Sequence, residues 1–137
     1  MSAAILNRTV EAPTISRPHL APSTHKAKQW ITVCSIDQIV PYTGVTALIQ
    51  DQQVAVFRLP GEQGDQVYAI SNYDPFSKAF VLSRGIVGDR GGEYKIASPI
   101  YKQTFSLITG QCFDDPSITL PTWTVRVVDS QVQVQIR

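Results

Sequence analysis

The feature that most constrains the fold of this chain is a succession of short runs of β-branched and aromatic residues that begins at Trp30. Turn-forming residues separate the runs, and this pattern is typical of an antiparallel β-sandwich or barrel. The final run, from Val132 to Ile136, alternates apolar and polar residues, so it predicts a strand with one face in water. We predict strands at residues 30–33, 45–50, 53–59, 66–70, 93–97, 104–108, 122–128 and 131–136.

Between the first two predicted strands, Ser35-Ile36-Asp37-Gln38 matches a helix capping box, in which the serine hydroxyl and the glutamine amide each satisfy a backbone group. We expect one short helical turn here, ended by Pro41. Asp129 and Ser130 are expected to turn the last hairpin. Four aromatic side chains are expected in the core, namely Trp30, Phe57, Phe105 and Trp123.

The first 28 residues differ in composition from the rest of the chain. Pro13, Pro18 and Pro22 lie among Ser, Thr and Ala without a sustained apolar period, so residues 1–28 are expected to form a flexible tail. Residues 29–137 then form one β domain, and with 43% hydrophobic residues the chain can bury a core. No apolar run reaches the roughly 20 residues that a membrane helix needs, so we expect no membrane contact.

Charge and cysteine content narrow the possible partners and the compartment. With 12 Lys and Arg against 11 Asp and Glu, the chain has no broad positive field for a phosphate backbone, so nucleic acid is not expected as a partner. Cys34 and Cys112 lie far apart and do not suggest a disulfide scaffold. Without a signal for export, two reduced and inert thiols fit the cytoplasm best.

Residues 71–112 contain two candidate loops, one with the sequence Asn72-Tyr73-Asp74-Pro75-Phe76 and one with Ser98-Pro99-Ile100-Tyr101. These loops resemble the cluster loops of Rieske proteins. In that family a Cys-x-His loop and a Cys-Pro-x-His-Gly loop, followed by a Phe-x-Leu strand and Thr-Gly, hold a two-iron cluster through thiolates and imidazoles. Here the second loop begins Ser98-Pro99 and is followed by Phe105, Leu107 and Gly110. The resemblance implies an all-β, Rieske-like antiparallel sandwich or barrel in which residues 72–112 form a degenerate cluster-loop region.

The positions that correspond to the cluster ligands hold Asp74 and Phe76 in the first loop and Ser98 and Tyr101 in the second. Phe76 has no lone pair, and Ser98 and Tyr101 lose a proton only at high pKa, so Asp74 is the only ordinary ligand among them. His19 and His25 both precede residue 29, which leaves the domain without histidine. The sequence therefore predicts no metal site, no bound cofactor and no catalytic residue in this chain.

A Rieske-like domain without cluster ligands resembles the small subunits of assimilatory NAD(P)H-dependent nitrite reductases. The resemblance is carried by Trp30, Val33-Cys34, Gly44, residues 54–58, Asn72, residues 74–76, residues 81–85, residues 97–99, Lys102-Gln103, Phe105, Leu107, Gly110 and Cys112. It implies that a large partner subunit carries FAD, sirohaem and a 4Fe-4S cluster and reduces nitrite to ammonium. The small subunit would support this reaction by contact, without a redox centre of its own.

Phe76 and Tyr101 have two possible roles in such a domain. Their rings can fill the space that a cluster occupies in Rieske proteins. They can also, together with Arg84 and Lys102, present aromatic and cationic contacts to a partner. Two other functions stay open beside the first: an electron carrier like the ferredoxins of ring-hydroxylating dioxygenases, or a binding module for another oxidoreductase.

Three further features have ordinary structural explanations. Arg84 can form an ion pair with Asp74 or Asp89, as loop arginines near carboxylates often do. Asp114-Asp115 before Pro116 is expected to form a turn rather than a carboxylate pair. The segment 85–88 lacks the lysine and the strand-to-helix setting of a phosphate-binding loop, so its glycines are expected to belong to an ordinary loop.

Overall fold

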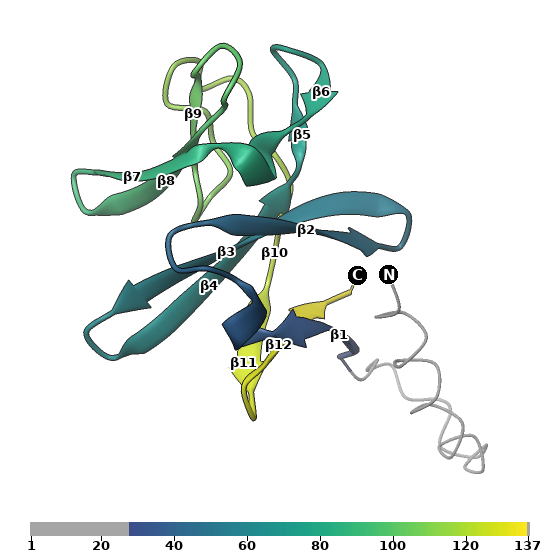
Figure 1. The fold of residues 1–137 in the computed structure, drawn as a ribbon. Helices are drawn as coiled ribbons and strands as arrows, with labels where there is room; N and C mark the ends of the chain where they lie inside the picture. Colours follow the sequence, from purple (N-terminus) through teal and green to yellow (C-terminus); the bar gives the residue numbers. More distant parts are fainter. Residues whose placement is uncertain (1–27, 137) are drawn as a thin grey trace.

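The computed structural model describes residues 28–136, and Figure 1 shows how they are arranged. The expected tail over residues 1–28 lies outside the described residues except for Lys28. The elements are β1 (Trp30–Ser35), η3 (Ile36–Gln38), β2 (Gly44–Ile49), β3 (Gln52–Gly61), β4 (Gly64–Ser71), β5 (Tyr73–Asp74), β6 (Ala79–Phe80), η4 (Leu82–Arg84), β7 (Ile86–Arg90), β8 (Glu93–Ala97), β9 (Thr104–Ser106), β10 (Thr122–Trp123), β11 (Val125–Val128) and β12 (Gln131–Gln135).

All strand pairings among the described residues are antiparallel, as predicted. The central sheet has the order β10-β4-β3-β2, and two three-stranded sheets, β1-β12-β11 and β7-β8-β9, lie on its two sides (Figure 1). Strands β5 and β6 form a separate hairpin on the same side of the central sheet as β7, β8 and β9. Within residues 28–136, no helix is long and apolar enough to cross a membrane.

Strand β3 explains why the domain has two cores. Val54 and Val56 point to the side of β1 and β12, whereas Ala55, Phe57 and Leu59 point to the side of β8 and β9. Successive side chains of a strand face opposite sides, so a strand that is apolar at every position is buried on both faces. The first core lies between β1-β12 and the central sheet, and the second core lies between the central sheet and β7-β8-β9.

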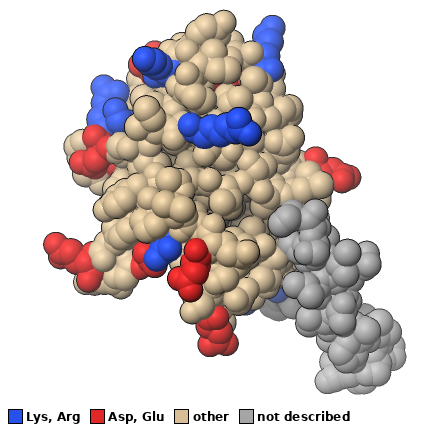
Figure 2. All heavy atoms as spheres, in the orientation of Figure 1, with Lys and Arg blue, Asp and Glu red and all other residues tan. Residues whose placement is uncertain are grey.

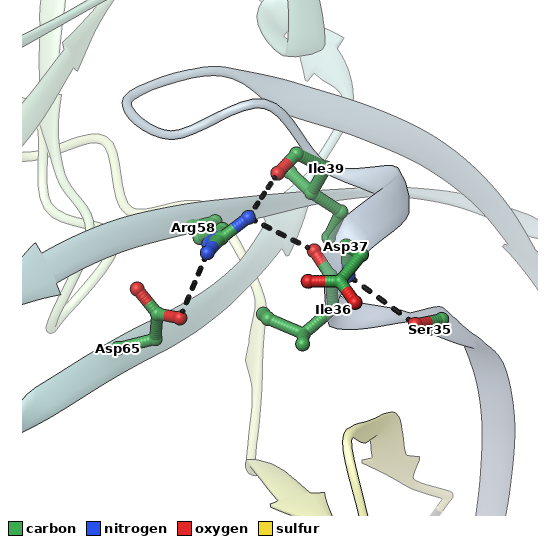
Figure 3. A network of polar contacts seen from close by, with 6 residues as sticks. All are labelled: Ser35, Ile36, Asp37, Ile39, Arg58 and Asp65. Atoms are coloured by element: carbon green, nitrogen blue, oxygen red, sulfur yellow. Dashed lines mark hydrogen bonds and ion pairs between the residues drawn. The ribbon is translucent and has the colours of Figure 1, made fainter.

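The first helical turn confirms the predicted capping box. The Ser35 hydroxyl accepts from the Asp37 N–H, and the Gln38 side chain accepts from the Ser35 N–H at 3.0 Å. Arg58 holds the same segment from β3, because its guanidinium donates to the carbonyls of Ile36 and Ile39 and pairs with Asp65 at 3.0 Å (Figure 3). The guanidinium therefore ties the segment after β1 to the β3–β4 hairpin.

Several boundaries differ from the prediction for physical reasons. The predicted strand 122–128 is divided, because β10 pairs with β4 of the central sheet and β11 pairs with β12. The predicted strand 104–108 ends at Ser106, whose hydroxyl accepts from the N–H groups of Ile108 and Thr109 and so forms a turn. The second helical turn, η4, was not predicted from the sequence.

Two other expectations are wrong. The glycine segment 85–88 is not a loop throughout, because Ile86 to Gly88 belong to β7 and pair with β8. Trp30 is only half-buried, and its ring lies 4.0 Å from the guanidinium carbon of Arg126. Phe57, Phe105 and Trp123 are buried as expected. The turn at Asp129-Ser130 is confirmed, and both residues have a positive φ.

Candidate functional site

Two loops that are adjacent in space correspond to the degenerate cluster positions. Loop 1 (residues 74–79) connects β5 to β6, and the Asp74 carbonyl closes it by accepting from the Lys78 N–H at 2.7 Å. Loop 2 (residues 98–103) connects β8 to β9, and the Gln103 carbonyl closes it by accepting from the Ser98 N–H at 2.9 Å. Each loop is thus closed by a backbone hydrogen bond of its own, independent of the contact between the two loops.

Asp74 joins the loops through its carboxylate. This side chain is completely buried, and its Oδ2 accepts from the Ser98 hydroxyl at 2.5 Å and from the Ser77 hydroxyl at 2.7 Å. Its Oδ1 accepts from the Phe76 N–H at 2.9 Å. A buried carboxylate is stable only where hydrogen bonds replace its hydration, and three donors from two loops do so here.

The same contacts set the charge of Asp74. Burial acts to raise the pKa of the carboxyl, but the hydrogen bonds from Ser98, Ser77 and the backbone N–H groups of Phe76 and Ser77 outweigh it. The pKa of Asp74 is therefore lower than its ordinary value, and the side chain is an anion at neutral pH. A charged hydrogen bond between loop 1 and loop 2 thus lies at the position of a cluster ligand.

The two aromatic residues at cluster positions have different surroundings. Phe76 is half-buried on the second core, with its ring centroid 6.1 Å from that of Phe105. Tyr101 is 62% exposed, so its ring does not fill the interior. The structure thus brings Asp74, Phe76 and Ser98 together and leaves Tyr101 outside this group.

Asn72 is a buried side chain that the sequence reasoning did not include among the site residues. Its amide donates to the Gln53 side chain at 3.0 Å, and its Oδ1 accepts from the Ser83 N–H at 2.7 Å. The Asn72 carbonyl accepts from the Leu82 N–H. Asn72, which precedes β5 and loop 1 in the chain, therefore positions η4 against the central sheet. In the sequence, Asn72 was marked only as one of the residues that carry the family resemblance, and its role depends on contacts with Gln53 and Ser83 that the sequence does not show.

Arg84 does not have the partner that its sequence neighbours suggested. Among residues 28–136 the only ion pair joins Arg58 and Asp65, and the Asp74 carboxylate is occupied by the contacts above. Arg84 is exposed at the end of η4. Gly85 then passes so close to β8 that an added Cβ would lie 2.1 Å from the Ala97 carbonyl oxygen.

The cysteines lie apart from this site. Cys112 is buried in the second core, and Cys34 is half-buried on β1. Burial raises the pKa of the Cys34 thiol, which disfavours the reactive thiolate. The two acids Asp114 and Asp115 have separate partners: Asp114 accepts from the Thr104 N–H at 2.8 Å, and Asp115 accepts from the Ser117 hydroxyl at 2.6 Å within one turn.

The residues present do not fit a two-iron, two-sulfur cluster. Such a cluster needs four thiolate or imidazole donors in two loops. Here the single carboxylate already accepts three hydrogen bonds, the Ser98 hydroxyl donates to it, Phe76 has no donor atom and Tyr101 faces solvent. Within the described residues no group of three or more His, Cys, Asp or Glu side chains could hold a metal ion.

Comparison with known proteins places this geometry in a family. Residues 29–135 match the model of the Rieske-like [2Fe-2S] domain. The NADH nitrite reductase small subunit of Escherichia coli K12 is 47% identical over 107 residues, which cover 78% of this chain and 97% of that relative. The solution structure of the nitrite reductase [NAD(P)H] small subunit from Erwinia carotovora is 46% identical with a TM-score of 0.65, and the match covers 79% of this chain and 82% of that one.

A longer relative contains a region similar to almost the whole chain. The nitrite reductase [NAD(P)H] large subunit of Klebsiella oxytoca is 37% identical over 135 residues, which cover 93% of this chain but only 14% of that protein. A counterpart of this domain is therefore part of a much longer polypeptide in that organism.

Proposed function

Because the chain belongs to the Rieske-like domain family, and within it to the small subunits of nitrite reductase, we propose that it supports the reduction of nitrite to ammonium by an NAD(P)H-dependent large subunit. It is part of an oxidoreductase complex, and the large subunit is its partner. FAD, sirohaem and a 4Fe-4S cluster reside on that large subunit, and the complex works in the cytoplasm.

The observation that carries this proposal is the Asp74–Ser98 hydrogen bond between the two loops. The chain has a Rieske-like domain, but the groups that join its two loops are a carboxylate and a hydroxyl. Neither group changes oxidation state under physiological conditions, so this domain does not relay electrons in the manner of a ferredoxin. It acts by contact, and a protein that binds one conformation of its partner preferentially stabilises that conformation.

The contact surface that we propose is the exposed end of the domain at loop 1, loop 2 and η4. Phe76 and Tyr101 supply aromatic surface there, and Arg84 and Lys102 supply charge. The Klebsiella oxytoca relative supports direct contact between this domain and the large subunit. In that relative, a segment similar to this chain and the rest of the large subunit form one polypeptide.

Reconstitution tests the proposed function. Purified large subunit is titrated with this chain, and nitrite-dependent oxidation of NAD(P)H is followed in the presence of each component alone and of both. The small subunit alone is expected to be inactive, and the rate of the large subunit is expected to rise and to saturate at a fixed stoichiometry. A rate that is unchanged at every ratio, with no complex detected by size-exclusion chromatography, would contradict the proposal.

A further inference from the structure

The exposed end of the domain combines cations with apolar side chains. Lys78 in loop 1, Arg84 at the end of η4 and Lys102 in loop 2 are all exposed. Three large apolar side chains on the same segments are also exposed, Ile86 at 74%, Tyr101 at 62% and Ile100 at 44%. We call this set of six residues the loop face.

Contacts between the three segments hold the loop face together. Asp74 bonds to Ser98, which joins loop 1 to loop 2. Ile86 pairs with Ala97, the residue before Ser98, and Gly85 packs against the Ala97 carbonyl. Arg84 and Ile86 therefore emerge beside the start of loop 2. The three segments that carry the loop face are thus adjacent in the fold, although they come from three parts of the sequence.

Charge is distributed unequally between this end and the rest of the domain. Residues 72–113 contain five Lys and Arg against three Asp and Glu, and one of these acids, Asp74, is buried. The other described residues contain three Lys and Arg against seven acids. Figure 2 shows the same separation on the face drawn, with Lys and Arg mainly over the part formed by β5–β9 and most acids toward the opposite end.

The cations of the loop face have no acidic partner among the described residues. Within residues 28–136, none of the three takes part in an ion pair. Lys78 and Lys102 also have φ values of 60° and 68°, a backbone conformation that glycine and asparagine adopt more easily than lysine. Lysine is thus present at two positions where the backbone alone favours glycine, asparagine or aspartate.

We infer that the loop face docks on a surface of the large subunit that has an apolar centre surrounded by carboxylates. This inference rests on the proposed function and names the chemistry of the partner surface. Ile86, Ile100 and Tyr101 would lose their contact with water at the centre of the contact. Lys78, Arg84 and Lys102 would meet carboxylates around it. Charges at the rim of an interface act mainly on the association rate, and salt screens them.

Binding of a double variant at two salt concentrations tests the inference. Lys78→Asn with Lys102→Asn removes two charges and places a residue at each position that tolerates a positive φ. At low salt the Kd for the purified large subunit is expected to rise about tenfold, mainly through slower association. At 0.5 M NaCl the difference from wild type is expected to fall to about twofold or less, because the charges are screened.

A control removes the same charge elsewhere, although Arg126 also contacts Trp30 and Gln133. Lys28→Asn with Arg126→Asn neutralises two exposed cations on or beside the β1-β12-β11 sheet, and wild-type binding is expected. Thermal unfolding checks that both double variants are folded. Arg84→Gln removes a loop-face charge that lies outside the two loops, and it is expected to weaken binding in the same salt-dependent way. Equal affinities of loop-face and control variants, or binding by wild type that salt does not weaken, would overturn the inference. Absence of any wild-type binding would instead contradict the proposed function.

Discussion

Asp74 shows how a single side chain can connect loops that a cluster connects in related proteins. Its anionic carboxylate accepts from Ser98, Ser77 and the Phe76 N–H in a buried setting. A hydrogen bond to a charged group contributes more to stability than one between neutral groups, and the loss of one partner leaves the other unsatisfied. Stability of the two loops therefore depends on the charge of this one residue.

We predict that Asp74→Asn lowers the free energy of unfolding by about 2 kcal/mol at pH 7 and that Ser98→Ala lowers it by about 1–2 kcal/mol. The pKa of Asp74 is depressed in the folded state, so its contribution is present above the ordinary pKa of a carboxyl and is lost as the pH falls through the folded value. Urea unfolding at a series of pH values should show wild type and Asp74→Asn converging in acid.

Asp115 provides the control for this pH dependence. It also accepts from a serine hydroxyl and a backbone N–H, both of Ser117, but within one local turn. Asp115→Asn should change stability much less than Asp74→Asn, because no second loop depends on it. Equal effects of the two substitutions would show that the contact between the loops contributes nothing of its own.

At this scale, the identities of the residues at the cluster positions could be predicted from the sequence, but their contacts could not. Matching each loop of this chain to a Rieske cluster loop identifies Asp74 and Ser98 separately. Their hydrogen bond depends on two segments 24 residues apart meeting in space. For the same reason Arg84 was expected beside a carboxylate that the fold assigns to two serines and a backbone amide.

Among the elements, the strands were predictable where their side chains alternate or form a continuous apolar run. Strand β8 has the predicted bounds, and β3 and β12 differ by a few residues. Strand β7 was missed because its glycine and charged residues read as a loop, and it is formed by pairing with β8 rather than by local preference. Alternation also cannot indicate that residues 122–128 change sheets.

The junction of η4 with β7 makes a prediction about packing. Gly85→Ala would place a Cβ 2.1 Å from the Ala97 carbonyl oxygen and 3.0 Å from Ile96 Cδ1, so η4 or β8 would have to shift. We expect a loss of about 1–3 kcal/mol in unfolding free energy, as for other overpacked positions. Gly88→Ala is the control, because its Cβ would meet only the flexible Lys95 side chain, at 3.2 Å. Similar melting temperatures for both variants would contradict the close approach.

For the whole molecule, two cores lie on the two faces of the central sheet, and the loops extend from the part of the domain that contains the second core. The sequence predicted the all-β fold because the apolar pattern requires buried strands. It did not predict the separation of charge between the two ends, because residues 72–113 become one surface only after β7, β8 and the loops are assembled. The composition of the full chain, with 12 Lys and Arg against 11 Asp and Glu, does not show this separation of charge.

The iron content of the purified chain tests the central claim, that this Rieske-like domain works without a cluster. The chain is expressed together with cluster-assembly proteins, purified without oxygen, and analysed for iron, acid-labile sulfide and visible absorption. We predict a colourless protein without stoichiometric iron, since one engaged carboxylate and two hydroxyls replace the thiolate and imidazole donors. About two irons and two sulfides per chain, with the visible and EPR spectra of a Rieske centre, would contradict it.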